Sequence, residues 1–228
     1  MKTLGLIGGT SWHSTLEYYR EINAQVSEKI GNASNPELLL YSINIDIMRK
    51  QVLPDIQQKY LEVSQKLIGA GAEALLICAN TPHMAVEYVQ PKIDVPFLHI
   101  ADATAKEAKR LGYHKLGLLG NRPTMTKAFL KDRLKEQHGL ITTIPEGEAI
   151  DQSHYFVSKE LTQGQFTNKA VVFYTQQIEE FKKKGLDAAI LGCTELPILL
   201  KDTETALPSL RTTDLHIQMA VDFILRDN

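Results

Sequence analysis

The two halves of the chain resemble each other, and this self-similarity constrains the fold more than any other feature. LGLIGG at residues 4–9 recurs as LGLLGN at 116–121, and GAEALLICANTP at 71–82 recurs as GLDAAILGCTELP at 185–197. The separations, 112 and 114 residues, nearly agree. Chance likeness is the alternative, because Gly, Ala, Leu and Ile dominate buried strand ends. We favour a duplication, which predicts two similar lobes related by a pseudo-twofold axis.

Short apolar runs bounded by turn residues alternate with stretches of helical period, which is typical of an α/β fold. We expect strands near 3–8, 38–44, 73–79, 115–120 and 187–192, and helices near 14–30, 55–70, 123–137, 165–184 and 213–226. The sequence therefore predicts two pseudo-symmetric lobes, each a mainly parallel sheet flanked by helices. Their expected limits are 1–98 plus 211–228 for the first and 99–210 for the second.

Ligands of open parallel sheets bind beyond the carboxyl ends of the strands. A site in the cleft between two such lobes would be built from four segments, one after each central strand. These segments are residues 8–14, 78–83, 120–126 and 192–197.

Composition excludes several functional classes. The 228 residues carry a formal charge of −2 with acidic and basic residues interspersed, so we expect no nucleic-acid partner. No apolar run approaches the roughly 18 residues of a membrane span, and no signal peptide is evident. Two cysteines make no disulfide framework, and the seven histidines lack metal-ligand spacing. We therefore expect a cytoplasmic protein without membrane contact and without a metal site.

Cys193 lies in LGCTELP, where a strand runs into a helix. Unpaired backbone N–H groups and the positive end of a helix would lower the pKa of its thiol. A thiolate there can act as a base or a nucleophile. A buried structural cysteine is the alternative, and the Thr-Glu-x-Pro helix start favours the functional thiol.

The first copy of this motif offers polar groups at the corresponding place. Thr81 is a candidate N-cap with Pro82 at the first helical position, which would leave amide donors suited to a carboxylate. Ordinary capping is an equal alternative. Asn80 adds a side-chain amide that would bind substrate or close an Asx turn.

The N-terminal GGTSWHST lacks both G-x-G-x-x-G and the Walker lysine, so it does not predict nucleotide binding. Ser14 followed by Glu17 indicates a capping box. Thr10 and Ser11 are placed to donate to a small anion. Trp12 is expected in the core.

Six motifs together resemble the aspartate/glutamate racemase superfamily. They are GLIGGTSWHST, ANTPH, FLHIADAT at 97–104, LTQGQFT at 161–167, GCTE at 192–195 and TTDLHI at 212–217. The resemblance implies two pseudo-symmetric α/β lobes with the active site between them, and activity without pyridoxal phosphate or metal. It also implies two thiols on opposite faces of Cα, one that removes the α-proton and one that returns a proton.

This sequence departs from the family pattern at residue 79. The usual first-lobe pattern is Cys-Asn-Thr, whereas this chain has Ala79 before Asn80, and Ala79 pairs with Cys193 at the separation of 114. Side chains alternate faces along a strand, so we expect Cys78 to point into the lobe and to act as packing. A bulge at the strand end would re-aim it.

The hypothesis is therefore a cofactor-independent amino-acid racemase with Cys193 as base, slow or one-sided because Ala79 replaces the first-lobe thiol. One alternative is a single-thiol decarboxylase or isomerase of a small dicarboxylate. Another is a catalytically silent amino-acid-binding protein.

The resemblance also implies the partners and the substrate contacts. The expected partner is a small amino acid or dicarboxylate, and a homodimer is expected. Arg49 lies beside Gln51 where the family has a side-chain selector, although solvent exposure is an equal reading for Arg49. Thr167 stands where some racemases carry a carboxylate-binding lysine, which favours a specificity broader than acidic amino acids. The implied substrate-binding residues are Thr10, Gln51, Asn80, Thr81, Asn121, Thr124 and Thr194.

Overall fold

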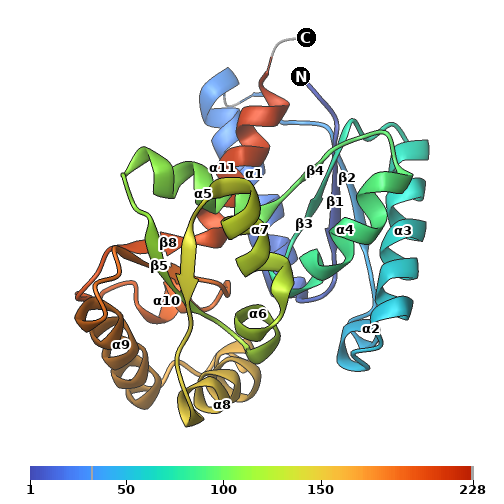
Figure 1. Cartoon of the computed structure of the whole chain (residues 1–228). Helices are drawn as coiled ribbons and strands as arrows, with labels where there is room; N and C mark the ends of the chain where they lie inside the picture. Colours follow the sequence, from blue (N-terminus) through green and yellow to red (C-terminus); the bar gives the residue numbers. More distant parts are fainter. Residues whose placement is uncertain (32, 227–228) are drawn as a thin grey trace. The chain divides into compact units, whose positions relative to one another are not determined.

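The structure is a computed structural model that describes residues 1–31 and 33–226 (Figure 1). By its contacts the chain divides into two units, the first comprising Met1–His99 with the segment from His216 onward, the second Ile100–Leu215. The chain thus leaves the first unit after His99 and returns to it within the last helix, α11 (Thr212–Ile224).

Each unit is built on a four-stranded sheet whose strands are all parallel. The first sheet has the order β2 (Leu38–Ser42), β1 (Leu4–Gly8), β3 (Ala74–Ile77), β4 (Phe97–Leu98). The second has the order β6 (Ile141–Thr143), β5 (Lys115–Leu119), β7 (Ala188–Leu191), β8 (Ser209–Arg211). The predicted fold class, α/β with two mainly parallel sheets flanked by helices, is confirmed.

The repeated stretches occupy equal positions in the two sheets. Leu4 of β1 lies opposite Ala74 of β3, and Leu116 of β5 lies opposite Ala188 of β7. The separations of 112 and 114 residues therefore relate the same pair of strands in the same register. The loops that follow β1 and β5, and those that follow β3 and β7, therefore start from corresponding positions in the two sheets.

Helices cover both faces of the first sheet. Its helical elements are α1 (Trp12–Ile30), α2 (Asp46–Arg49), α3 (Leu53–Gly69), the 3₁₀ turns η1 (Thr81–Ala85) and η2 (Gln90–Lys92), α4 (Val86–Val89) and the greater part of α11. Leu4 and Leu6 pack with apolar residues of α1 and α11, whereas Ile7 packs with residues of α3 and α4. This alternation is expected of a strand buried on both faces.

The second unit has a corresponding set of helices. They are α5 (Ile100–Arg110), α6 (Arg122–Thr126), α7 (Ala128–His138), α8 (Glu148–Tyr155), the π-helix η3 (Phe156–Glu160), the 3₁₀ turn η4 (Leu161–Gln163), α9 (Asn168–Lys183) and α10 (Leu196–Leu199). One face of β7 packs on α9, where Ala189 and Leu191 join Tyr174, Ile178 and Phe181 in an apolar cluster.

The expected start of the first helix is wrong. Ser11, not Ser14, is the N-cap, and its hydroxyl oxygen accepts from the Ser14 N–H at 3.3 Å. Trp12 is not among the residues that α1 buries, which are Ser14, Thr15, Tyr18, Ile22 and Val26, and it is 60% exposed instead of lying in the core.

The region expected as a helix over 123–137 forms two helices. Lys127 adopts an extended backbone between α6 and α7. The strands β4, β6 and β8 were not predicted, since two or three residues carry no measurable periodicity.

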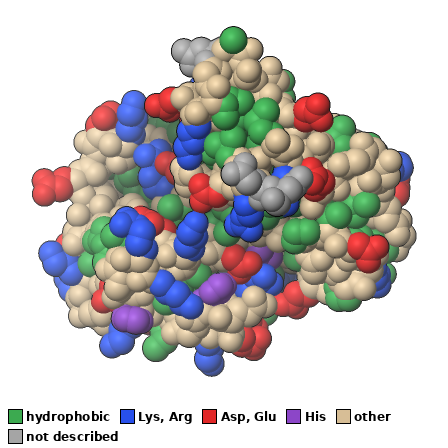
Figure 2. Space-filling view, turned by 90° about the horizontal axis from the view of Figure 1, so that it is seen from above, with side chains coloured by type: hydrophobic (Ala, Val, Ile, Leu, Met, Phe, Trp, Pro, Cys, Tyr) green, Lys and Arg blue, Asp and Glu red, His purple; other side chains and the backbone are tan. Residues whose placement is uncertain are grey.

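The surface carries charges of both signs. Figure 2 shows Lys and Arg side chains interspersed with Asp and Glu side chains on one face of the molecule. In the part of the chain that the structure describes, no helix combines the length and the apolar character that crossing a bilayer requires.

Candidate functional site

Polar residues gather at the carboxyl edge of the first sheet. Thr10 follows β1, while Asn80 and Thr81 follow β3, the neighbouring parallel strand. Gly9 has a φ of 92°, and a Cβ there would overlap the backbone of Ile43, so only glycine fits this turn. The chain is thereby brought close to the end of β2.

The hydroxyl of Thr10 is hydrogen-bonded to the buried phenol of Tyr60. Its Oγ1 lies 3.0 Å from Tyr60 Oη, and Tyr60 is 1% exposed on α3. Burial raises the pKa of Tyr60 far above its ordinary value, although the Thr10 contact opposes the rise. Tyr60 therefore stays a neutral phenol that fixes the Thr10 hydroxyl.

The expected N-cap role of Thr81 is wrong. Asn80 is the flanking residue and Thr81 the first residue of η1, which makes no side-chain capping bond at its start. η1 runs directly into α4 and η2, so residues 81–92 form one continuous helical run that begins as a 3₁₀ turn. Any carboxylate binding there would depend on local amides and hydroxyls.

The two faces of β3 separate Cys78 from the position of Ala79. Leu76 and Cys78 belong to the cluster with α1 and α11, while Leu75 and Ile77 belong to the cluster with α3. Cys78 is 1% exposed, and burial raises the pKa of its thiol strongly. Cys78 is a packing residue, as the alternation of faces predicts.

Cys193 follows β7 and lies on the face of that strand that packs against α9. It packs against the α9 cluster that contains Ala189 and Leu191, so residues 189, 191 and 193 share one side of the strand. The corresponding side of β3 carries residues 75 and 77, and the same alternation leads to Ala79. The repeat therefore aligns Ala79, not Cys78, with Cys193, and the faces of the preceding strand residues agree with this alignment.

The Cys193 thiol is bound to a neighbouring carboxylate. Its Sγ donates to Glu195 Oε2 at 2.8 Å, and the Thr194 hydroxyl donates to the same oxygen at 2.8 Å. Glu195 is 9% exposed. One carboxylate oxygen of Glu195 therefore accepts two side-chain hydrogen bonds at the end of β7.

The expected lowering of the Cys193 pKa is wrong. Burial raises the pKa of Cys193 well above its ordinary value, and the negative charge and hydrogen bond of Glu195 raise it further. Backbone N–H groups of Glu195 and Leu196 lower the pKa, but they are outweighed. The following helix, α10, has only four residues, so its dipole contributes little.

Asn121 and Thr124 stabilise the loop after β5. Asn121 Oδ1 caps α6 by accepting from the Thr124 N–H at 2.9 Å. Thr124 is fully buried, and its methyl group lies where a Cβ on Gly120 or Gly192 would touch it. Thr124 thus packs the ends of β5 and β7 together, which limits its role to a backbone or hydroxyl contact.

Arg49 is the last residue of α2, and Gln51 lies in the turn between α2 and α3. Gln51 has a φ of 53°, a left-handed backbone uncommon for this residue, and its side-chain amide donates to the Met48 carbonyl. Arg49 pairs with Asp46 at 3.3 Å and is exposed. Both side chains make local contacts, and their expected role as selectors stays a prediction.

Glu195 is the residue of the candidate site that the sequence did not indicate. Its signal was the Glu two residues after Cys193, which was interpreted only as part of a helix start. A carboxylate at this spacing reaches back to the thiol because the chain turns immediately after the strand.

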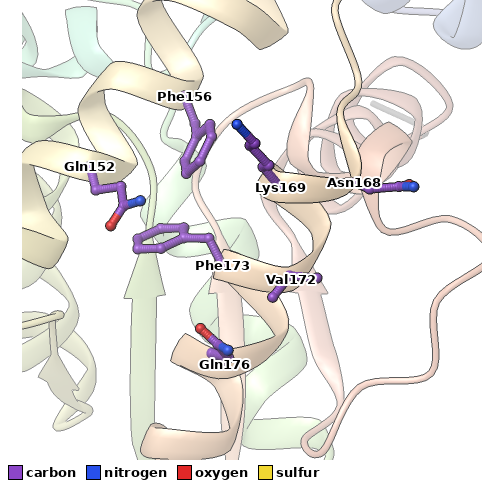
Figure 3. A pocket seen from close by; sticks show the side chains of 7 residues that line it. All are labelled: Gln152, Phe156, Asn168, Lys169, Val172, Phe173 and Gln176. Carbon is purple, nitrogen blue, oxygen red and sulfur yellow. The ribbon is translucent and has the colours of Figure 1, made fainter.

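A separate pocket of about 430 Å³ lies in the second unit among α8, η3 and α9 (Figure 3). The rings of Phe156 and Phe173 form its apolar floor, with centroids 5.3 Å apart. None of the predicted site residues lines it, and its polar side chains, such as Lys169 and Gln176, are exposed. We assign no chemistry to this pocket.

Within the described residues, no group of three or more His, Cys, Asp and Glu side chains is arranged to hold a metal ion.

The comparison with protein families identifies this arrangement. The Asp/Glu/Hydantoin racemase family model matches residues 7–220, which includes both duplicated strand ends. The chain belongs to this family. The family therefore covers Thr10, Asn80 and Cys193 as well as the departure at Ala79.

Solved structures of other family members share the fold along the whole chain. A Yersinia pestis protein with a provisional Asp/Glu racemase assignment is 35% identical, with a TM-score of 0.93, and covers 99% of this chain and 100% of that one. An aspartate racemase homologue from Pyrococcus horikoshii OT3 is 31% identical, with a TM-score of 0.86 and the same coverage.

Curated relatives are more distant. The broad specificity amino-acid racemase RacX of Bacillus subtilis is 23% identical over 216 residues, which is 90% of each chain. The chain also matches glutamate racemases, but the match spans only about half of their length, 53% for that of Mycobacterium ulcerans.

Proposed function

We propose that this protein is a cofactor-independent amino-acid racemase in which Cys193 removes the Cα proton. The observation that carries the proposal is the Cys193 thiol at the end of β7, bonded to the Glu195 carboxylate in a chain of the racemase family. Family membership supports the reaction class, while the identity of the base is our inference.

Glu195 supplies the acceptor that a thiol base requires. In the proposed sequence the Cys193 proton passes to Glu195 Oε2, 2.8 Å from the sulfur. The thiolate then takes the Cα proton: the Cα–H bond breaks, an S–H bond forms, and the electron pair moves onto the substrate carboxylate. The raised pKa of Cys193 leaves few thiolates at neutral pH but makes each a stronger base.

The first lobe makes the reaction one-sided. Ala79 occupies the position equivalent to Cys193 and offers a methyl group, while Cys78 is buried among α1 and α11 residues. A proton for the opposite face of Cα must then come from water or a hydroxyl. Exchange of the Cα proton with solvent is therefore faster than inversion.

Hydroxyl and amide groups at the two sheet edges are the proposed substrate contacts. Stabilising charge that moves onto the substrate carboxylate requires donors that are already in place. Thr10 meets this condition because Tyr60 holds it. The full proposed set is Thr10, Gln51, Asn80, Thr81, Asn121, Thr124 and Thr194.

The substrate is an amino acid, and we propose a range that is not restricted to aspartate and glutamate. Thr167 is committed to its own surroundings, since its Oγ1 donates to Glu160 at 2.8 Å and caps α9. A threonine is uncharged, so this position offers no positive charge to a side-chain carboxylate of the substrate. The similarity to a broad specificity racemase over most of the chain points the same way. A cytoplasmic homodimer remains part of the proposal.

The test is deuterium exchange at Cα in deuterium oxide, followed by NMR for all L- and D-amino acids. The wild type should label at least one amino acid, and Cys193→Ala should lose about 10²- to 10⁴-fold in exchange rate. Cys78→Ala is the matched control, because it removes the other thiol and should leave exchange intact. Absence of label in every amino acid, or full exchange by Cys193→Ala, would refute the proposal.

A decarboxylase or isomerase of a small dicarboxylate is the second candidate, because a single thiol is sufficient to protonate one face of an enediolate. The same screen discriminates between the two. A dicarboxylate that is consumed without any labelled amino acid would favour this candidate, while tight calorimetric binding without exchange would indicate a silent binding protein.

A further inference from the structure

The first unit contains a cluster of buried aromatic and imidazole rings that the proposed proton transfer does not use. His83, His99 and His216 are 0%, 2% and 0% exposed, and Tyr18 is 0% exposed. The His83 ring centroid lies 4.6 Å from that of His99 and 5.4 Å from that of His216. The four side chains come from α1, η1, the end of β4 and α11, which are far apart in sequence.

His216 is held by two hydrogen bonds of opposite sense. Its Nε2 lies 2.7 Å from the Leu98 carbonyl oxygen, which only accepts, so Nε2 carries the hydrogen. In the neutral ring Nδ1 then accepts from the Tyr18 hydroxyl at 2.9 Å. The Tyr18 ring meets the His216 ring edge-on with centroids 5.6 Å apart. His216 therefore carries a hydrogen on Nε2 and is held in a fixed orientation.

His83 makes its hydrogen bonds through the other ring nitrogen. Its Nδ1 lies 2.8 Å from the Ala79 carbonyl oxygen and 3.1 Å from that of Asn80. Both partners only accept, so Nδ1–H donates to them. These two carbonyls belong to the turn that carries the proposed first-lobe substrate contacts. Packing against His99 and His216 fixes the plane of the His83 ring.

We propose that His83 is a positioning residue for the turn Ala79–Thr81, acting through its Nδ1–H on two backbone carbonyls. The inference rests on the proposed function, because positioning matters only if this turn binds substrate. The two carbonyls directly precede η1, so the ring of His83 holds the chain where it turns from the end of β3 into the helical run. A displacement of about 1 Å at such a turn costs up to roughly 100-fold in rate.

The tautomers provide a test that requires no substrate. Long-range ¹H–¹⁵N NMR of the wild-type imidazoles distinguishes Nδ1–H from Nε2–H rings. His83 is expected as Nδ1–H and His216 as Nε2–H, assigned from the loss of each signal in His83→Asn and His216→Gln. An Nε2–H tautomer at His83 would overturn the proposal.

A matched pair of substitutions tests the effect on the turn. Asparagine at 83 keeps an amide N–H at about the reach of Nδ1, whereas glutamine carries its amide one bond further out. His83→Asn should retain kcat/KM for Cα exchange within about threefold, and His83→Gln should lose about 10- to 100-fold. The loss should lie mainly in KM, because the turn binds the carboxylate throughout the reaction.

Val26→Ala is the control for a general loss of stability in the same unit. Val26 is fully buried on α1, in the apolar cluster of α1 and α11. The substitution should lower the melting temperature without the KM change. Equal losses in His83→Asn and His83→Gln, or an equal KM change in Val26→Ala, would contradict a positioning role.

The backbone amides separate this inference from the proposed function. In ¹H–¹⁵N spectra, His83→Gln should shift the amide signals of residues 79–81 more than His83→Asn does. If the wild type exchanges no amino acid but this difference is seen, the proposed function fails while the hold on the turn stands. If exchange occurs and residues 79–81 shift equally in both variants, the positioning role fails alone.

Discussion

At the scale of single residues, the site depends on the pairing of Cys193 with Glu195. The carboxylate raises the pKa of the thiol it is meant to deprotonate, because a negative charge disfavours a neighbouring thiolate. In the proposed mechanism the same carboxylate accepts the proton of the thiol. The raised pKa therefore means that few Cys193 thiols are ionised at rest and that each thiolate is a strong base.

Alkylation by iodoacetamide measures this effect directly. Only the thiolate reacts, so Cys193 should be modified slowly at neutral pH and faster by roughly tenfold per unit as pH rises toward its raised pKa. Glu195→Gln removes the charge that raises the pKa, so its profile should shift to lower pH. Mass spectrometry of the alkylated peptide locates the label.

Cys78 is the internal control for that experiment. It is buried with a strongly raised pKa, and it should stay unmodified in the folded protein at every pH used. An unshifted profile in Glu195→Gln would show that the carboxylate does not act on the thiol.

At the scale of elements, the contact between β5 and α9 fixes the second sheet. A Cβ at Gly117 would overlap the ring of Phe181 on α9, an aromatic side chain in a tightly packed cluster. Gly117→Ala should therefore lower the free energy of unfolding by about 1–3 kcal/mol. Urea denaturation measures the change.

Two other glycines serve as controls for Gly117. A Cβ at the equivalent Gly5 would lie 2.8 Å from Leu75 Cδ2, the far end of a flexible side chain, so Gly5→Ala should cost less. Gly69 at the end of α3 has open space, and Gly69→Ala should change stability by less than about 0.5 kcal/mol. A smaller effect at Gly117 than at Gly5 would contradict the packing argument.

The helices α5 and α7 are joined by a partly buried ion cluster. Asp102 accepts from Arg133 through two bonds of 2.7 Å and from His138 at 2.8 Å. Burial alone would raise the pKa of Asp102, but the hydrogen bonds and charges of Arg133 and His138 outweigh it and hold the pKa below its ordinary value. The cluster thus stabilises the protein while Asp102 is ionised.

A depressed pKa gives stability that is present above the unfolded pKa and lost as pH falls through the folded value. Asp102→Asn should cost about 1–2 kcal/mol near pH 7, and its difference from the wild type should shrink below about pH 4. Thermal unfolding across pH checks this. The pair Glu180 and Lys183 on α9 is the control, because both side chains are exposed and Glu180→Gln should change stability little at any pH. A pH-independent difference for Asp102→Asn would contradict the account.

The sequence predicted the long, repeated elements but not the ends of helices. The repeat located the central strands of both sheets because it records register, which the parallel pairs of Leu4 with Ala74 and Leu116 with Ala188 preserve. The sequence indicates helix starts after Asn80 and Cys193 but not the lengths of these helices. After Asn80 the turn η1 continues through α4 and η2 to Lys92, whereas α10 after Cys193 has only four residues. A proline near a helix start indicates where the helix begins and not how far it continues.

At the scale of the whole molecule, the duplication explains both what was predicted and what was missed about the site. The alignment of the two halves places Ala79 at the position that corresponds to Cys193, and the strand faces agree with this alignment. The comparison was unable to show the Glu195 contact, because a hydrogen bond between neighbouring side chains depends on the local turn. The expected lobe limits were 98/99 and 210/211, and the contacts divide the chain at 99/100 and 215/216.

The predicted homodimer is a separate matter for the whole molecule. Sedimentation velocity at two concentrations would give one species of twice the chain's 25.6 kDa if it is correct. A single species of 25.6 kDa would refute the dimer without affecting the chemistry assigned to Cys193.

The most direct measurement of the central claim compares two rates in deuterium oxide: deuterium entry at Cα by NMR and formation of the opposite enantiomer by chiral chromatography. With the wild type, deuterium should enter the substrate at least about tenfold faster than the enantiomer forms, and Ala79→Cys should bring the two rates together by adding the second thiol. Equal rates in the wild type, or loss of exchange in Cys78→Ala, would contradict the assignment of a one-thiol site.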